Sequence, residues 1–180
     1  PAANALTTDY TPTLDWGDAA NAATYTIQIA TDSAFSAIVS SDGAVPASTF
    51  TVPGGEQLDP NRTYYWRVNT KNLPGVESAW SATRTFRTAV EPPVLVSPAD
   101  TVAIDNKRPT FDWSDVTGAT GYTIQIATNS SFTTGLATAS TTGATASTYT
   151  RTADLLASTT YYWRVQAKAT NGPSAWSATW

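Results

Sequence analysis

One stretch of the chain occurs twice, and this duplication constrains the fold more than any other feature. Residues 11–35 match residues 108–132 at 15 of 25 positions without a gap, at an offset of 97 residues. The hexapeptide TYYWRV at 63–68 recurs at the same offset, and SAWSAT at 78–83 recurs at 174–179. A unit of this length is far longer than solenoid repeats and has the size of an independently folding domain. We therefore expect two similar domains, residues 1–89 and residues 90–180.

The ends of the two copies are cut differently. Copy one has no counterpart of residues 93–97, and copy two has no counterpart of residues 85–88. We expect copy one to lack its first strand and copy two to lack most of its last. A fragment of a longer array would show this pattern. A polymer in which one chain supplies a strand to the next would also show it, because an unpaired strand edge invites strand addition. Pro92 and Pro93 predict a short, stiff linker between the copies.

Apolar residues alternate with polar ones in short runs, as a sheet with one buried face requires. Gly, Pro, Asn and Asp separate these runs into about seven strands per copy, a spacing typical of a two-sheet sandwich. The fold class expected is therefore all-β, with two tandem sandwiches. The expected core of copy one is Leu14, Trp16, Tyr25, Ile27, Ile29, Phe50, Val52, Leu58, Tyr64, Trp66, Val68 and Phe86. The expected core of copy two is Phe111, Trp113, Tyr122, Ile124, Ile126, Tyr149, Leu156, Tyr161, Trp163 and Val165.

Several motifs give this pattern a family resemblance. Leu58-x-Pro60, Tyr64-x-Trp66-x-Val68, Ser78-Ala-Trp80-Ser81 and Phe86-x-Thr88 together resemble the second half of a fibronectin type III domain. The resemblance implies a tyrosine corner, in which the hydroxyl of the first Tyr binds the preceding loop. It also matches Trp16 and Trp113 to the family's core tryptophan. The segment Pro93–Pro98 is similar to the version found in secreted bacterial multidomain proteins. Such sandwiches host many unrelated roles, so the resemblance specifies the fold better than the function.

Composition argues against catalysis and against several partners. The chain has no His and no Cys, so nucleophile–His–Asp catalysis and imidazole or thiolate metal sites have no residues to use. Its net charge of −4, with no basic cluster, disfavours nucleic acid, and no run is long and apolar enough for membrane insertion. The acidic pairs Asp15/Asp18 and Asp112/Asp115 recur in both copies, which favours a structural role over glycosidic or calcium chemistry. We expect no enzyme activity, no cofactor and no metal.

A second recurring set lies outside the expected core, at outward positions of one strand and in the Ser-Ala-Trp-Ser element that follows it. It comprises Tyr65, Arg67 and Trp80 in copy one, and Tyr162, Arg164 and Trp176 in copy two. The arrangement resembles the tryptophan–arginine ladder of cytokine-receptor domains, in which guanidinium groups stack on indoles. We favour intramolecular packing of the arginine on the tryptophan. The alternative is an exposed aromatic strip that stacks on sugar rings or on another subunit.

Surface composition bears on location and modification. A cysteine-free, Thr-rich, acidic chain indicates an exported protein, extracellular or at the cell surface, and of bacterial type. Outward-facing threonines, as at Thr24 and Thr26, favour strands and solubility, or alternatively carry O-linked glycans. Asn61 and Asn129 stand in N-glycosylation acceptor patterns.

The function expected from these features is a non-catalytic structural or adhesive module, such as an extracellular spacer or a segment of a surface repeat array. One alternative is a filament subunit assembled by strand exchange through the incomplete ends. The other is a carbohydrate-binding accessory module of a secreted polysaccharide-active enzyme. The expected partners are neighbouring copies of the same repeat or protein, with surface glycans as a further possibility.

Overall fold

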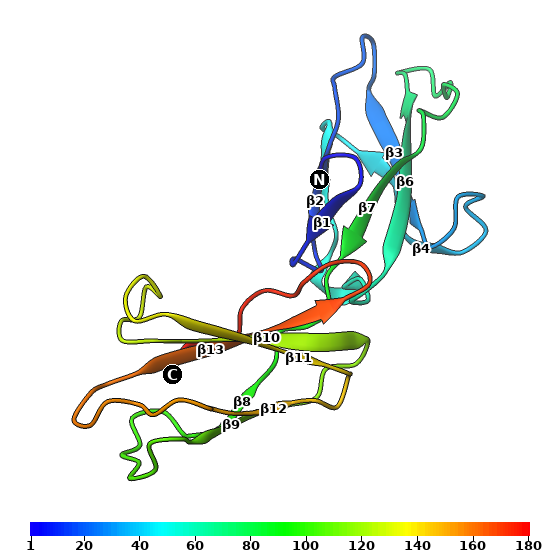
Figure 1. Ribbon diagram of the computed structural model, residues 1–180. Coiled ribbons are helices and arrows are strands. Elements are labelled where there is room, and N and C mark those ends of the chain that lie inside the picture. The colour runs from blue at the N-terminus through cyan, green and yellow to red at the C-terminus, as the bar shows by residue number, and fades with distance from the viewer. The chain divides into compact units, whose positions relative to one another are not determined.

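A computed structural model describes all residues from Pro1 to Trp180 (Figure 1). It contains thirteen β-strands, one short 3-10 turn η1 (Gly54–Glu56) and no α-helix, which confirms the all-β class. The chain divides into two compact units, Pro1–Thr88 and Ala89–Trp180. None of its helical segments has the length and apolar character that a membrane span needs.

Unit 1 is built from a five-stranded sheet and a two-stranded one. The larger sheet has the order β1-β7-β6-β3-β4, in which β1 runs parallel to β7 and the other neighbours are antiparallel. Strands β2 and β5 form the smaller antiparallel pair. The strands are β1 (Ala5–Thr7), β2 (Thr13–Asp15), β3 (Thr24–Ala30), β4 (Ile38–Val45), β5 (Thr49–Thr51), β6 (Thr63–Lys71) and β7 (Arg84–Thr88).

Unit 2 consists of two three-stranded layers, which Figure 1 shows one above the other. One layer has the order β11-β10-β13 and the other has the order β12-β9-β8, all antiparallel. The strands are β8 (Leu95–Ser97), β9 (Thr110–Trp113), β10 (Ala119–Ala127), β11 (Ala137–Thr142), β12 (Thr148–Thr150) and β13 (Tyr162–Ala169).

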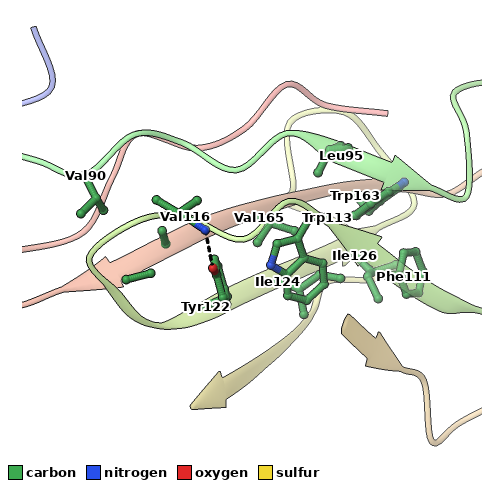
Figure 2. Close-up of a cluster of buried hydrophobic side chains, with 12 residues drawn as sticks. Val90, Leu95, Phe111, Trp113, Val116, Tyr122, Ile124, Ile126, Trp163 and Val165 are labelled. Carbon is green, nitrogen blue, oxygen red and sulfur yellow. Dashed lines mark hydrogen bonds between the residues drawn. The ribbon is translucent and has the colours of Figure 1, made fainter. Parts of the chain in front are cut away.

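Both cores lie between the sheets and follow the predicted alternation. In unit 1 the buried cluster includes Tyr25, Ile27 and Ile29 of β3, together with Tyr64, Trp66 and Val68 of β6, and Phe86 of β7. In unit 2 Tyr122, Ile124 and Ile126 of β10 face Phe111 and Trp113 of β9 (Figure 2). Phe50 and Tyr149 are half-buried and pack against the two cores.

A buried tyrosine hydroxyl in unit 2 closes one end of the core. The Tyr122 hydroxyl accepts a hydrogen bond from the Val116 amide at 2.8 Å (Figure 2) and donates one to the Ala144 carbonyl at 2.7 Å. Burial of this phenol raises the pKa of Tyr122. The hydroxyl therefore stays neutral and satisfied inside the sandwich, as a buried polar group requires.

The core position predicted for Leu156 is wrong. Leu156 is 71% exposed, whereas its neighbour Leu155 is 8% exposed and belongs in the core. The backbone explains the difference, because the Leu155 amide donates to the Lys107 carbonyl at 2.8 Å, as the Leu58 amide donates to the Tyr10 carbonyl at 2.9 Å. Leu155, and not Leu156, is the counterpart of Leu58 at the offset of 97 residues.

Two matching core positions are buried to different degrees in the two units. In unit 2, β8 pairs with β9 and Trp113 is 2% exposed, whereas Trp16 of unit 1 is half-buried. In unit 1, β7 pairs with β6 beside the buried Tyr64, whereas Tyr161 of unit 2 is half-buried.

Candidate functional site: an arginine–aromatic stack in each unit

The predicted surface ladder of unit 1 is a closed stack around Arg67. Arg67 on β6 lies opposite Gln28 on β3, and its Nε and Nη2 donate to Gln28 Oε1 at 3.0 and 2.8 Å. The guanidinium carbon lies 4.0 Å from the ring centre of Phe35 and 4.3 Å from that of Trp80. The cation is thus held between two aromatic rings and tied at its edge by an amide oxygen.

Unit 2 repeats this arrangement closely. Arg164 Nε and Nη2 donate to Gln125 Oε1 at 3.0 and 2.8 Å. Its guanidinium carbon lies 3.9 Å from the ring centre of Phe132 and 4.4 Å from that of Trp176. Desolvation within the stack lowers the pKa of Arg164, and a guanidinium nevertheless stays charged at neutral pH. The recurrence of four residues in one geometry identifies the stack as a property of the repeat.

The Ser-Ala-Trp-Ser element places each indole over its arginine. In unit 1 the Ser78 and Ser81 hydroxyls accept hydrogen bonds from the backbone amides of Thr70 and Val68, at 3.0 and 3.1 Å. The two serine amides donate back to the carbonyls of the same two β6 residues, at 2.9 and 2.8 Å. The two serines therefore hydrogen-bond the backbone amides and carbonyls of β6 that β7 does not pair with. They also fix the position of Trp80, which lies between them.

The same element recurs in unit 2. Ser174 and Ser177 accept hydrogen bonds from the amides of Ala167 and Val165, both at 3.0 Å. Their own amides donate to the carbonyls of those residues at 2.9 and 2.8 Å. The side chain of Trp176, between these serines, is held over Arg164 in consequence.

The second ring of each stack comes from a loop that sequence reasoning missed. Phe35 and Phe132 have φ values of 58° and 57°, which are uncommon for a bulky residue. A polar side chain folds each loop, because Asp32 accepts the amides of Ala34, Ser36 and Ala37 at 2.9, 3.2 and 2.7 Å. Asn129 Oδ1 has the same role in unit 2, accepting the amides of Thr133 and Thr134 at 3.0 Å each. The sequence signal that could have identified these residues is the recurrence of Gln28 and Phe35 as Gln125 and Phe132, at the offset of 97 residues.

The amide bonds to Asp32 have an electrostatic consequence. Backbone hydrogen bonds from Ala37 and Ser36 lower the pKa of this carboxyl group below its ordinary value of 3.8. The charged carboxylate is therefore the form that holds the loop of unit 1 in place. The neutral amide of Asn129 holds the loop of unit 2.

The remaining residues of the predicted sites lie outside the stacks. Tyr65 and Tyr162 are half-buried on β6 and β13, and neither takes part in the ring contacts of Arg67 or Arg164. Asn61 is half-buried at a position with φ of 56°. The Asn129 amide nitrogen, to which an N-linked glycan would attach, donates to Ser131 Oγ and Thr133 Oγ1 at 2.6 and 2.7 Å.

The geometry of a tyrosine corner is present in both units. The Asp59 amide donates to the Tyr64 hydroxyl at 2.9 Å, and the Leu156 amide donates to the Tyr161 hydroxyl at 3.1 Å. Burial raises the pKa of Tyr64.

No group of three or more His, Cys, Asp or Glu side chains is close enough together to hold a metal ion. The contacts of the duplicated residues are therefore with each other and with the backbone.

Fold and site together define the class, a tandem of immunoglobulin-like β-sandwiches of the fibronectin type III kind. Residues 3–91 and 97–180 match the sequence model of the family described as "Rha78A-like, N-terminal immunoglobulin domain", and the chain belongs to this family. No curated protein matches the chain in sequence.

Two solved structures align with the chain. The two-domain fibronectin type III segment of chicken tenascin aligns with a TM-score of 0.50 at 13% identity, over 100% of this chain and 93% of that one. The FN1–FN3 domains of chicken CNTN1 align with a TM-score of 0.41 at 15% identity, over 99% of this chain and 66% of that one. Domains of this kind are generally non-catalytic, and their tandem is a structural or adhesive type of module.

Proposed function

We propose that the tandem is an extracellular spacer, a passive module that holds other parts of its protein away from the cell surface. One observation carries this proposal. The residues best suited to recognise a ligand, Arg67 with Trp80 and Arg164 with Trp176, contact each other within each unit in nearly the same geometry. The family description, an N-terminal immunoglobulin domain, supports a module within a longer protein. The absence of Cys and the acidic, Thr-rich surface support an exported location.

A display experiment tests the spacer role. One, two or three tandems are inserted between a cell-surface anchor and a fluorescent reporter, and the height of the reporter above the membrane is measured. A spacer raises the reporter by an equal step for each tandem added. A matched control replaces each tandem by 180 residues of Gly/Ser linker, whose reach grows only about as the square root of its length. A reporter height that follows the flexible control, or that does not rise, contradicts the proposal.

Recognition of glycans is the competing role for the same residues. A sugar ring needs an open indole face, and Arg67 and Arg164 already cover one face of Trp80 and Trp176. Titration of oligosaccharides against the tryptophan fluorescence of the intact chain distinguishes the two roles. A spacer gives a flat response. A saturable change that disappears in the Trp80→Ala and Trp176→Ala variants would favour an accessory module of a polysaccharide-active enzyme.

A further inference from the structure

Two of the sheets end on a long strand that has only one neighbour. Strand β4 of unit 1 pairs with β3 alone, and β11 of unit 2 pairs with β10 alone. The other edges are short or covered, because β1, β2, β5, β8 and β12 have three residues each and the Ser-Ala-Trp-Ser element bonds the outer edge of β13. An edge strand presents unpaired amides and carbonyls, which natural proteins normally protect against pairing with another chain.

Strand β4 is protected in two ways and β11 in neither. Strand β4 contains the charged Asp42, and its pairing with β3 is interrupted at two points. Strand β11 pairs with β10 over its whole length without a shift of register. It contains no proline, and no charged residue occurs anywhere from Val116 to Thr150. Charges, prolines and bulges are the common means of blunting an edge, so β11 is open to a further strand.

The hydrogen-bond phase of β11 shows which backbone groups face outward. The Gly143 amide donates to the Thr120 carbonyl at 2.9 Å, and these two residues continue the register of the β10–β11 pair. Alternate residues of an antiparallel strand bond the same neighbour, so Ala139 and Thr141 bond β10. Ala139 also packs against the core. The exposed residues of the strand point their amides and carbonyls away from β10, and they are Thr138, Ser140 and Thr142.

This outward set is symmetrical about Ser140. The pattern Thr-x-Ser-x-Thr is the same in both directions, so a second β11 strand lying antiparallel matches the first. A two-fold axis at Ser140 places this residue opposite its own copy and Thr138 opposite Thr142. All three outward residues of each strand then exchange hydrogen bonds with outward residues of the other, and hydroxyl side chains face hydroxyl side chains.

Facing threonines already join antiparallel strands in both units. Thr13 on β2 lies opposite Thr51 on β5, and their hydroxyl oxygens are 2.8 Å apart. Thr110 on β9 and Thr150 on β12 make the same contact at 2.8 Å. Cross-strand pairs of this kind stabilise an antiparallel sheet. The two threonine pairs of a β11 dimer repeat a contact that the chain uses within each unit.

The charge distribution favours a second copy of the chain as the partner at this edge. Each copy has a net charge of −4, so two copies repel each other where their charged residues approach. Strands β11 and β10 carry no charge, and the nearest charged side chains of that sheet are on β13, two strands away. Two strand spacings are about 10 Å, which is comparable with the Debye length at physiological salt. Two copies can therefore meet at β11 with little repulsion, whereas an uncharged edge gives a charged partner no attraction.

We propose that two copies of the chain associate side by side through β11, in an antiparallel pair centred on Ser140. Their three-stranded sheets join into one sheet of the order β13-β10-β11-β11-β10-β13. The interface is small, so association is reversible, with a dissociation constant of about 0.1 mM. The inference goes beyond the spacer role, because spacers attached close together on one surface have a high local concentration and pair laterally.

Sedimentation equilibrium of the intact chain, from about 10 µM to about 1 mM, brackets the expected affinity. We expect the mean mass to rise from 19.0 kDa towards twice that value. Ser140→Lys places two like charges opposite each other at the axis, so this variant stays a monomer. The matched control is Ser41→Lys at an exposed position of β4, and it associates as the parent does. A parent that is monomeric at every concentration, or equal association of the two variants, overturns the proposal.

An exchange of charge locates the axis. Ser140→Glu alone also stays a monomer, because two carboxylates then face each other. An equimolar mixture of Ser140→Lys and Ser140→Glu restores association, because opposite charges meet at the axis. A mixture that associates no more than either variant alone overturns the pairing about Ser140.

Amide exchange measured by NMR shows which backbone groups pair. A dissociation constant of about 0.1 mM leaves about a fifth of the chain monomeric at about 1 mM, so the amides of Thr138, Ser140 and Thr142 exchange about fivefold more slowly there than in dilute solution. The amides of Ala139 and Thr141 bond β10 in the monomer and keep their rates. Association that slows neither set, or both sets equally, overturns the pairing through β11. The reporter height in the display experiment depends on the length of each tandem and not on its neighbours, so the two proposals fail separately.

Discussion

The cost of removing the core tryptophan should differ between the two units, although the residue is the same. Trp113 is 2% exposed and meets Tyr122 edge-on at 5.5 Å, inside a cluster that β8 covers. Trp16 makes the matching contact with Tyr25 at 5.4 Å but is only half-buried. Trp113→Ala should therefore cost unit 2 about 3–5 kcal/mol, as for a fully buried Trp. Trp16→Ala should cost unit 1 roughly half as much, because less apolar surface leaves contact with the protein.

Hydrogen exchange with mass spectrometry measures both costs in the intact chain. Buried amides of β10 report the opening of unit 2, and those of β3 report the opening of unit 1. A cost of 3–5 kcal/mol speeds exchange by about a hundredfold to a few thousandfold, since each 1.4 kcal/mol is tenfold. In each variant the unit without the substitution is the internal reference. Equal costs at Trp16 and Trp113, or β10 protection in Trp113→Ala that matches the parent, would refute this account of the cores.

Three further predictions follow from local geometry. The lowered pKa of Asp32 gives unit 1 stability that is fully present above its unfolded value of 3.8 and is lost as pH falls through the folded value. Asp32→Asn should therefore flatten the acid limb of a pH titration of unit 1 stability, and a slope that persists would exclude the carboxylate as its source. Asn129→Asp should introduce such a slope into unit 2, as measured by exchange between pH 5 and pH 2 in steps of about one unit. Gly121→Ala should destabilise unit 2 by more than about 1 kcal/mol, because a Cβ there would lie 2.3 Å from the Thr141 carbonyl oxygen, and a thermal melt like that of the parent would contradict this.

The sandwich fold was predictable from two features of the sequence. The duplication indicates two similar domains, and the period-two alternation indicates strands that bury one face in a core. Leu156 shows the limit of alternation alone, since two adjacent leucines satisfy the pattern equally well in opposite registers. The backbone bond of Leu155 to Lys107 settles the register, and an alignment at the offset of 97 residues would have indicated the same residue. Trp16 shows a different limit, because alternation gives the face of the sheet on which a side chain lies and not how much of that side chain is covered.

The stacks were predictable only in part. Arg67 and Trp80 could be paired from the sequence, because Arg67 is at an outward strand position and Trp80 lies in the Ser-Ala-Trp-Ser element that follows. Phe35 could not be assigned to the same site. Its ring reaches the guanidinium only because the loop adopts a positive φ and Asp32 holds three backbone amides. Such loop geometry leaves no periodic pattern in a sequence. Recurrence was the one usable signal, because Gln28 and Phe35 both return in the second copy.

The claim at the centre of this account is that Arg164 and Trp176 stabilise their own unit and do not form a ligand site. A double-mutant cycle over Arg164→Ala, Trp176→Ala and the double variant measures the free energy that couples them. The exchange of β10 amides reports the stability of unit 2 in each protein. A guanidinium 4.4 Å from the ring centre of an indole should give a favourable coupling of about 0.5–2 kcal/mol. A coupling indistinguishable from zero would contradict the structural role of the stack.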